Sequence, residues 1–404
     1  MAIECLSLII TAQCNLHCSY CYQNAKNAHR AGWDVVRAGI DLVFGEGLSQ
    51  VELMFLGGEP LLEFNLLRRA VSYAEALDRG GKHFRFSLST NGTLVSETVA
   101  DYLDEHKFDV QLSFDGVQEA QLYRGRGTFE ILDRLLDSFR AEHAELFRNR
   151  LRIALTVVPE TISFLSNSIQ YLLEKDVREI FISSCTTPYP GWQADKIHEL
   201  DEVFARIAEL SRNHVEKTGS IPVVWLRKAT DEIPQMGTGI SICSGLNGKT
   251  LAMDLDGQLY TCPMFVESYQ KFPSGSLMEQ QLSKLKLGNV RDPEVHNRRA
   301  ALAESARMEN VWICPEGCSS SYGNCDECEY YGRCSVCPVS VWQASSASGP
   351  RRIPDFICAF NKVALKYRDR FPCVTDAVKK FLPEPDASDP IRRLEEYLRT
   401  RRSR

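Results

Sequence analysis

Three cysteines lie close together near the start of the chain, in the stretch TAQCNLHCSYCYQN at residues 11–24. Cys14, Cys18 and Cys21 have the spacing C-x3-C-x2-C. Cysteine thiolates are the usual ligands of iron–sulfur clusters. Three thiolates on a cluster of four irons leave one iron open to bind a substrate, whereas a fully ligated cluster mainly transfers electrons. The trio therefore favours reactive iron–sulfur chemistry, with a zinc site lacking its fourth ligand, or chance, as the alternatives.

Cysteine is abundant in the rest of the chain as well. The sequence contains 15 cysteines, and many of them fall between Cys243 and Cys358. The start of the chain has no positively charged region typical of a signal peptide, and no apolar run is long enough to span a membrane. We therefore expect a cytoplasmic protein with no membrane partner, whose thiols bind metal or do redox chemistry. The net charge of -6 gives no basic excess, so nucleic acid is not an expected partner.

The first half of the chain alternates strand-like and helix-like segments, which is typical of an α/β fold. The strand candidates are apolar on both faces, at residues 5–12, 51–57, 84–90, 109–114, 151–158 and 179–184. Helical patterns are found at residues 33–45, 62–79, 96–106, 128–147, 163–175 and about 194–217. These repeated units predict a parallel sheet with right-handed crossovers, and six strands predict a partial, TIM-like (β/α)6 barrel. Because functional loops lie at the carboxyl ends of such strands, the cysteine trio falls at the mouth of the barrel.

The pattern changes after about residue 240. The stretch KTLAMDLDGQLYTC (249–262) predicts a hairpin that turns at Asp256-Gly257. Beyond it the apolar periodicity thins while cysteine, glycine and serine rise, so we expect metal to order a small irregular domain. The expected organisation is a barrel over 1–220, a linker over 221–242, a cysteine-rich domain over 243–375 and a C-terminal helical tail over 376–404.

Further motifs follow the cysteine trio in a fixed order. LGGEPLL (56–62), STNGT (89–93) and LSFDG (112–116) come at the ends of the second, third and fourth predicted strands. Together with the trio they resemble the radical S-adenosylmethionine (radical SAM) enzymes. The resemblance implies that Cys14, Cys18 and Cys21 hold a [4Fe–4S] cluster. The amine and carboxylate of S-adenosylmethionine would then bind the fourth iron.

The resemblance also assigns roles in binding S-adenosylmethionine. Gly57, Gly58 and Glu59 would meet the methionine ammonium, because glycine permits close backbone approach and the carboxylate supplies charge. Tyr20 and Tyr22 flank the last ligand, where the family contacts adenine. Ser113 and Arg124 are candidates for contacts to the ribose or the carboxylate. The alternatives are a simple turn at GGEP, turn capping by Ser113 and Asp115, and a solvated loop arginine at position 124.

The cysteine-rich segment resembles the SPASM extension of radical SAM enzymes, which holds two auxiliary [4Fe–4S] clusters. The resemblance gives the distal cluster its ligands Cys325, Cys328, Cys334 and Cys358. It gives the proximal cluster Cys243, Cys262 and Cys337, with Cys318, Cys314 or an open iron completing it. The gap between Cys334 and Cys337 is two residues, where the extension has three. The alternative is a zinc knuckle built on CDEC and CSVC.

Three cysteines stay outside these motifs. Cys5, Cys185 and Cys373 are expected to be small buried hydrophobes, with Cys185 near the predicted mouth of the barrel. The expected cofactors are therefore three [4Fe–4S] clusters, one of them binding S-adenosylmethionine.

The resemblance implies reductive cleavage of S-adenosylmethionine to a 5′-deoxyadenosyl radical, which takes hydrogen from a substrate. SPASM-bearing relatives mostly modify peptides, so we expect cross-linking, epimerisation, excision or oxidation of a ribosomally made precursor peptide. Relatives that mature sulfatases carry an aspartate directly after the cysteine that aligns with Cys262, where this chain has Pro263. That difference counts against a sulfatase substrate.

Two partners follow from the same resemblance. A flavodoxin- or ferredoxin-type reductant would supply the electron. Because only thirteen residues precede Cys14, the peptide's leader would need a separate binding protein or would dock directly. The rival functions are a radical SAM dehydratase or epimerase acting on a small molecule such as a sugar, and a non-enzymatic metal-binding scaffold.

Overall fold

The computed structural model describes residues 2–77, 83–187, 189, 191–227, 248–308, 317–331, 333–334, 336–346 and 348–371. Several expectations concern residues outside these ranges. They are those for Cys243, Cys314 and Cys373, for most of the linker at 221–242 and for the tail at 376–404. Within the described ranges, no helix combines the length and the apolar character needed to cross a membrane.

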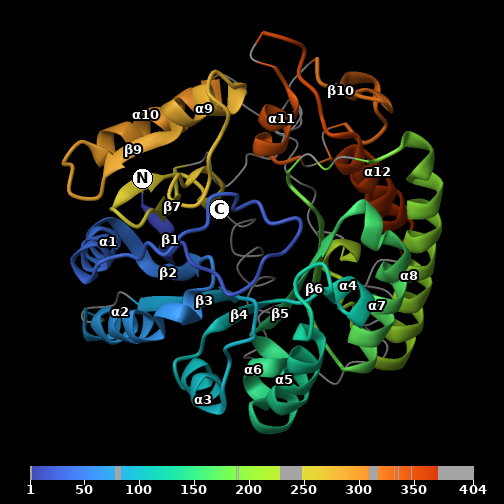
Figure 1. Ribbon diagram of the computed structural model, residues 1–404, viewed down its shortest axis with the longest axis horizontal. Helices are drawn as coiled ribbons and strands as arrows, with labels where there is room; N and C mark the ends of the chain where they lie inside the picture. Colours follow the sequence, from blue (N-terminus) through green and yellow to red (C-terminus); the bar gives the residue numbers. More distant parts are fainter. Residues whose placement is uncertain are drawn as a thin grey trace, which may run out of the picture.

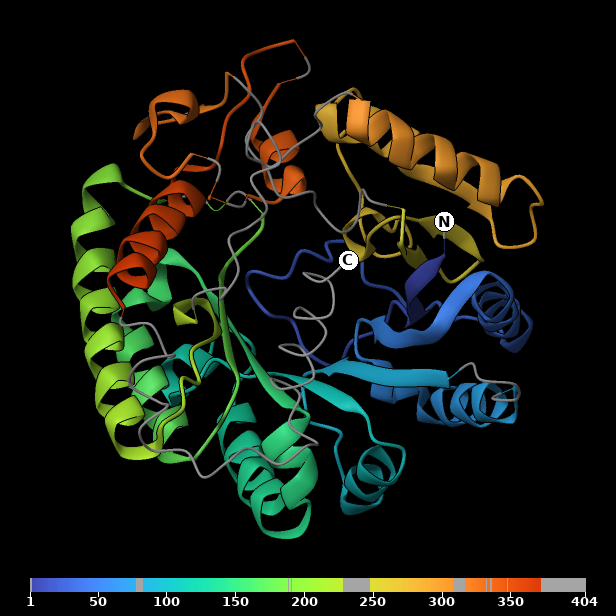
Figure 2. The same ribbon diagram turned by 180° about the vertical axis from the view of Figure 1, so that it is seen from behind.

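The centre of the molecule is a curved sheet with helices on its outer side (Figures 1 and 2). Its nine strands have the order β6-β5-β4-β3-β2-β1-β7-β8-β9. The first six strands are parallel, each to its neighbour: β1 (Ile3–Thr11), β2 (Gly47–Gly57), β3 (His83–Thr90), β4 (Asp109–Ser113), β5 (Leu151–Val157) and β6 (Ile180–Ser184). The prediction of an α/β fold with a partial six-stranded barrel is confirmed.

The barrel helices are α1 (Trp33–Glu46), α2 (Phe64–Leu77), α3 (Glu97–Glu105), α4 (Gln118–Gln121), α5 (Thr128–Glu142), α6 (Ala144–Asn149), α7 (Ile162–Glu174) and α8 (Ile197–Thr218). The single helix expected at 128–147 is therefore wrong. His143 leaves the helical conformation, with φ -123° and ψ 52°, and separates α5 from α6. Short 3-10 turns precede several helices, at Pro60–Glu63 before α2 and at Ala194–Lys196 before α8.

Strand β1 lies inside the sheet, between β2 and β7. Its last six residues are buried, as the apolar run LSLIIT requires when helices cover one face and the barrel interior covers the other. The apolar side chains of all six parallel strands join one large core. This core fixes the carboxyl end of β1, and with it the cysteine loop that follows.

The sheet continues into the segment assigned to the cysteine-rich domain. β7 (Thr250–Met253) pairs with β1 in parallel, and β8 (Gln258–Tyr260) and β9 (Lys286–Asn289) add antiparallel strands. The predicted hairpin is present, and Gly257 at its turn has φ 83°. The segment after residue 249 therefore first extends the barrel sheet, through β7, β8 and β9.

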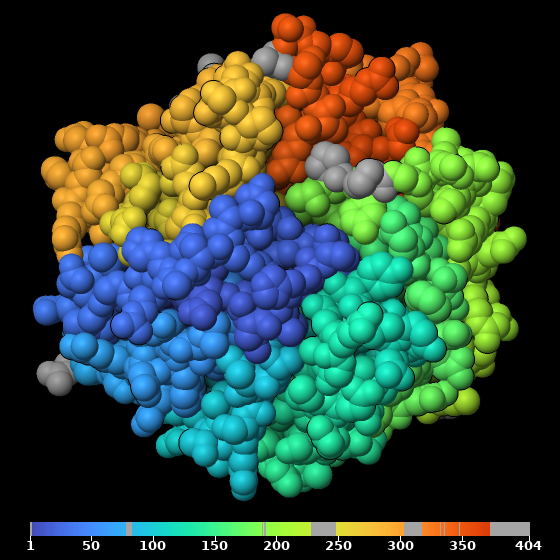
Figure 3. All heavy atoms as spheres, in the orientation of Figure 1, coloured from blue at the N-terminus to red at the C-terminus, as the bar shows by residue number. Residues whose placement is uncertain are grey.

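The rest of the C-terminal region is less regular. It holds α9 (Leu277–Leu285), α10 (Val295–Met308), β10 (Ser319–Ser320), β11 (Gly323–Asn324), α11 (Pro338–Ala344) and α12 (Asp355–Arg370). Helix α12 packs along α8, where Phe360 meets Phe204 with ring centroids 5.2 Å apart. We call residues 317–371 the cysteine-rich module. In Figure 3 the blue N-terminal segment fills the middle of one face, between the orange-red C-terminal region and the green helices of the barrel.

Candidate functional site

The cysteine loop follows β1 at the carboxyl edge of the sheet. Cys14, Cys18 and Cys21 are free thiols of intermediate exposure. The amide N–H of Cys21 donates to the carbonyl of Cys18 at 3.1 Å, and that of Leu16 donates to the Cys14 sulfur at 3.4 Å. Burial raises the pKa values of Cys14 and Cys18, and the thiol of Cys21 adds to both shifts. The three sulfurs therefore lie within electrostatic reach of one another.

The donor chemistry of this loop suits an iron–sulfur cluster. All three ligands would be thiols from a single turn, and none is used in a disulfide. Lys26 and Arg124 lower the pKa of Cys18, which favours the thiolate that metal binding requires. Among the described residues, no three His, Cys, Asp or Glu side chains form a group suited to one metal ion.

Gly57 is the last residue of β2, and Gly58 follows it; both lie against the cysteine loop. The amide of Gly58 donates to the carbonyl of Thr11 at 2.9 Å. A Cβ on Gly57 would lie 2.3 Å from the Thr11 oxygen, and a Cβ on Gly58 would lie 2.1 Å from the Gln13 oxygen. Both distances are too short for any other residue. The glycines are thus required by the chain's own loop, a close approach that the sequence analysis attributed to the ligand.

Glu59 joins the ends of two strands. Its carboxylate is 1% exposed and accepts hydrogen bonds from the Thr90 hydroxyl and the Asn91 amide, both at 2.8 Å, and from the Leu61 amide at 3.1 Å. Burial raises the pKa of Glu59, and these three donors oppose the rise. Asn91 extends the link to the cysteine loop, because its side-chain amide donates to Asn15 at 2.8 Å. The motifs GGE and STNGT therefore hold the loop from one side.

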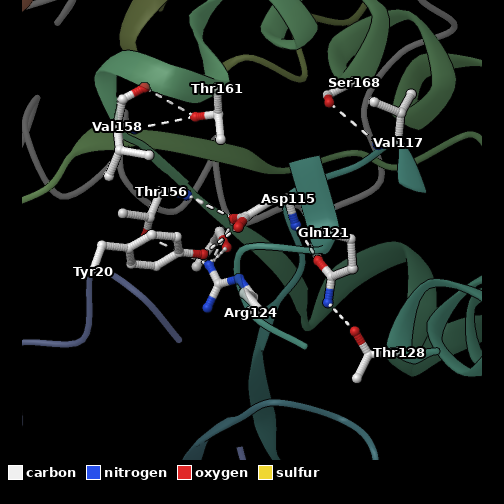
Figure 4. Close-up of polar contacts among 11 residues, drawn as sticks. Tyr20, Asp115, Val117, Gln121, Arg124, Thr128, Thr156, Val158, Thr161 and Ser168 are labelled. Atoms are coloured by element: carbon white, nitrogen blue, oxygen red, sulfur yellow. Dashed lines mark hydrogen bonds and ion pairs between the residues drawn. The ribbon is translucent and has the colours of Figure 1, made fainter. Parts of the chain in front are cut away.

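A buried ion pair holds the loop from the other side (Figure 4). Arg124 and Asp115 are 8% and 1% exposed, and the Arg124 Nη2 lies 2.8 Å from the Asp115 carboxylate. Asp115 also accepts hydrogen bonds from the Tyr20 hydroxyl and from the amide of Thr156, the latter at 3.0 Å. Burial alone would lower the pKa of Arg124, but Asp115 and Tyr20 raise it. The alternatives of a solvated Arg124 and of Asp115 as a turn cap are therefore wrong.

Two buried polar atoms beside the loop have no hydrogen-bond partner among the described residues. One is Nε of Arg124. The other is the side-chain oxygen of Gln23, whose amide nitrogen donates to the Gly57 carbonyl at 2.8 Å. Such atoms are costly to leave unpaired, so they indicate where a polar ligand would bind. Gln23 was missed in the sequence analysis, and its signal was its place two residues after Cys21. Ser113 ends β4 and is half-buried.

Tyr22 connects the loop to the C-terminal region. Its ring meets that of Tyr269 edge-on, with centroids 6.1 Å apart. The Tyr269 hydroxyl donates to the carbonyl of Pro263 at 2.9 Å, directly after Cys262. Burial raises the pKa of Tyr22, and the thiols of Cys21 and Cys262 both contribute. A pair of aromatic rings thus lies between the first cysteine group and Cys262.

Four cysteines gather in the cysteine-rich module, as expected for the distal group. Burial raises the pKa of Cys358 to about 11, and the thiols of Cys334 and Cys325 add to the rise. The ammonium of Lys362 lies near both Cys328 and Cys358. Cys325, Cys328, Cys334 and Cys358 therefore share one region.

Cys318 belongs to the same region. It is fully buried beside Cys325, whose amide donates to its carbonyl at 3.0 Å. Cys262 and Cys337 instead pack against the main core. Cys185 is 3% exposed in that core, as expected of a small buried hydrophobe.

Comparisons with known proteins agree with this arrangement. Residues 8–161 match the family model of the radical SAM superfamily. The cysteine-type anaerobic sulfatase-maturating enzyme of Clostridium perfringens (strain 13 / Type A) is 25% identical over 343 residues, covering 78% of this chain and 88% of that enzyme. An uncharacterized protein of Methanocaldococcus jannaschii is 29% identical over 177 residues, which are 43% of this chain and only 60% of that protein.

Two solved structures share the fold over most of the chain. The structure of native anSMEcpe with bound AdoMet and the Kp18Cys peptide has a TM-score of 0.68 at 20% identity. It covers 94% of this chain and 100% of that one. Streptococcus suis SuiB bound to the precursor peptide SuiA has a TM-score of 0.55 at 13% identity, covering 88% of this chain and 76% of that one.

Proposed function

We propose that this chain is a radical SAM enzyme related to the anaerobic sulfatase-maturating enzymes, and that it modifies a peptide. The observation that carries the proposal is the group of three free thiols at the carboxyl end of β1, held between two buried networks. A [4Fe–4S] cluster, when bound there, supplies the electron that cleaves S-adenosylmethionine, and the resulting 5′-deoxyadenosyl radical takes hydrogen from the substrate.

We assign Cys14, Cys18 and Cys21 to this cluster. Three ligands leave one iron for the amine and carboxylate of S-adenosylmethionine. The unpartnered Nε of Arg124 and side-chain oxygen of Gln23 supply an N–H donor and an acceptor beside the loop for a polar ligand. Gly57, Gly58 and Glu59 position the loop, and with Tyr20, Tyr22 and Ser113 we assign them to the S-adenosylmethionine site.

We assign Cys325, Cys328, Cys334 and Cys358 to a distal auxiliary cluster. Cys243, Cys262 and Cys337 are assigned to a proximal one. The burial of Cys318 beside Cys325 favours Cys314 or an open iron as the fourth proximal position. The edge-on rings of Tyr22 and Tyr269 lie between the first group and Cys262. We propose three clusters in total, within a barrel over 1–220 and a cysteine-rich domain over 243–375.

The substrate class is supported by the relatives. Solved structures that share this fold carry a bound peptide. Pro263 takes the position where sulfatase-maturing relatives have an aspartate, so we propose a precursor peptide other than a sulfatase. A flavodoxin- or ferredoxin-type protein is the proposed reductant, with a separate leader-binding protein.

Anaerobic reconstitution tests the site. We expect about twelve irons per chain and cleavage of S-adenosylmethionine by the dithionite-reduced protein. The variant Cys14→Ala/Cys18→Ala/Cys21→Ala should retain about eight irons and lose cleavage. Cys185→Ser, a thiol of the main core, is the matched control and should retain both. Cleavage that persists in the triple variant would refute the site.

A second measurement tests the substrate class. The loaded enzyme is incubated with the peptides encoded by neighbouring reading frames, and their masses are compared before and after reaction. A mass change that requires Cys14 supports the proposal. If a sugar is turned over and every peptide is unchanged, the proposed peptide modification is wrong, and the enzyme acts on a small molecule instead.

A further inference from the structure

Three side chains outside the cysteine motifs direct hydrogen-bond donors at the distal thiols. The Ser320 hydroxyl donates to the Cys358 sulfur at 3.1 Å. The Asn361 amide donates to the Cys334 sulfur at 3.6 Å. The Lys362 ammonium, a potential donor, lies near the thiols of Cys328 and Cys358. Together these side chains reach three of the four proposed ligands.

Helix α12 explains why these donors converge. Cys358, Asn361 and Lys362 are spaced i, i+3 and i+4, which places them on one face of the helix. This face packs over the small cluster that contains Cys318 and Cys325. Ser320 reaches the group from a different element, β10, and is buried. The arrangement is fixed by regular structure rather than by a flexible loop.

Donors of this kind change the energetics of an iron–sulfur cluster. Reduction adds a negative charge that spreads onto the sulfurs. Hydrogen bonds to the sulfurs and a nearby cation stabilise that charge, so they raise the reduction potential. A buried setting strengthens the effect, because water screens it less.

We propose that Ser320, Asn361 and Lys362 are positioning residues that raise the reduction potential of the distal cluster. This inference rests on the proposed function, since it requires the distal ligands assigned above. A raised potential makes the distal cluster an acceptor for an electron that leaves an oxidised substrate. The role is separate from binding S-adenosylmethionine, and therefore from the residues around the first cysteine loop.

Redox titration tests the inference without using turnover. The variants Ser320→Ala, Asn361→Leu and Lys362→Met are prepared in the Cys14→Ala/Cys18→Ala/Cys21→Ala background, so that only the auxiliary clusters contribute. Dithionite titration is followed by electron paramagnetic resonance. At a fixed potential we expect each variant to lower the ratio of reduced to oxidised distal cluster about threefold to tenfold. This corresponds to about 30 to 60 mV, at 59 mV for each tenfold change of a one-electron couple.

Two matched variants separate a tuning role from a structural one. Lys362→Arg keeps the charge and should keep most of the potential. Lys366→Met removes the same charge from the next turn of α12, where Lys366 binds Asp201 at 2.6 Å, and should leave the potential unchanged.

An unchanged midpoint in all three variants with full iron content would overturn the inference and leave the proposed function intact. Loss of about four irons from all three, without a shifted signal, would also overturn it, because the residues would then be structural. Absence of auxiliary iron in the parent background would refute the proposed clusters themselves.

Discussion

The barrel and the cysteine-rich module are ordered by different forces. The barrel buries apolar side chains from six parallel strands and their helices in one continuous core. Trp342, Phe356 and Phe360 of the module join that core, and the module's separate cluster has six buried members among the described residues, of which Cys318 and Cys325 are two. Its remaining apolar members are Val336, Val341, Ile353 and Ile357. Because so small a cluster supplies little burial energy, we expect the part of the module around it to depend on what its thiols bind, whereas the barrel should not.

Removal of iron gives the largest expected effect. In the chelated protein we expect rapid tryptic cleavage in the module, after the exposed Arg333 and Arg352, because the thiols no longer hold it together. The barrel should persist as a fragment, although Arg152 is equally exposed on β5. Mass spectrometry of timed digests measures both. Earlier cleavage at Arg152 than at Arg333 would contradict this prediction, because it would show that the barrel opens before the module.

The buried thiol of Cys185 in the barrel core should also be far less reactive in the folded protein than in the unfolded chain. Burial raises the pKa of Cys185 from 9.0 to about 12, so its thiolate is about a thousandfold scarcer than in an unfolded chain. At pH 8 we expect iodoacetamide to modify Cys185 about a thousandfold more slowly in the native protein than in urea.

The same shift predicts a pH dependence of stability. The folded-state pKa lies above the unfolded one, so folding favours the protonated thiol. That contribution is complete below pH 9 and is lost as the pH rises towards 12. Cys185→Ser should remove this part of the alkaline loss, measured as the change in urea midpoint between pH 8 and 10. Equal losses of stability in the wild-type protein and in Cys185→Ser would show that the Cys185 thiol does not cause the alkaline loss.

A smaller effect is expected where the cysteine loop rests on β2. Gly58→Ala places a methyl group against the backbone of Gln13, which cannot move aside as a side chain can. We expect a loss of about 1–3 kcal/mol in the free energy of unfolding. Gly45→Ala is the matched control, because a Cβ there meets nothing within 4 Å, and it should be neutral or stabilising by up to about 1 kcal/mol. Urea titrations compare the two. Equal stabilities would show that the loop is free to shift.

Much of the barrel could be predicted because its signals are local. Apolar runs such as LSLIIT and VELMFLG mark buried parallel strands, and each motif at a strand end was in its expected place. The break at His143 left no such signal, since the apolar periodicity of 128–147 runs through it. The continuation of the sheet by β7 to β9 was also missed, because pairing between residues 5 and 250 leaves no trace in the sequence between them.

In the candidate site, too, features with a local sequence signal could be predicted, and features that depend on distant partners could not. The three cysteines could be identified by their spacing, and the motifs GGE and STNGT by the resemblance to radical SAM enzymes. The roles of Gly58 and Asp115 could not, because each depends on a partner that the fold brings close: Gln13 in one case and Arg124 in the other. Gln23 was missed because glutamine is common on protein surfaces, and its place two residues after Cys21 became informative only with its burial.

The inner position of β1 has a consequence for biosynthesis. β1 precedes the other described strands along the chain and leaves the ribosome before them, yet β7 (Thr250–Met253), one of its two hydrogen-bonded neighbours, is made much later. At about 5–20 residues per second, roughly 12–50 s pass between the synthesis of Cys5 and that of Thr250. The cysteine loop therefore waits beside an unfinished sheet edge through most of translation. If the loop holds the proposed cluster, we expect iron delivery to follow the synthesis of residues 250–253, when the strand has both neighbours.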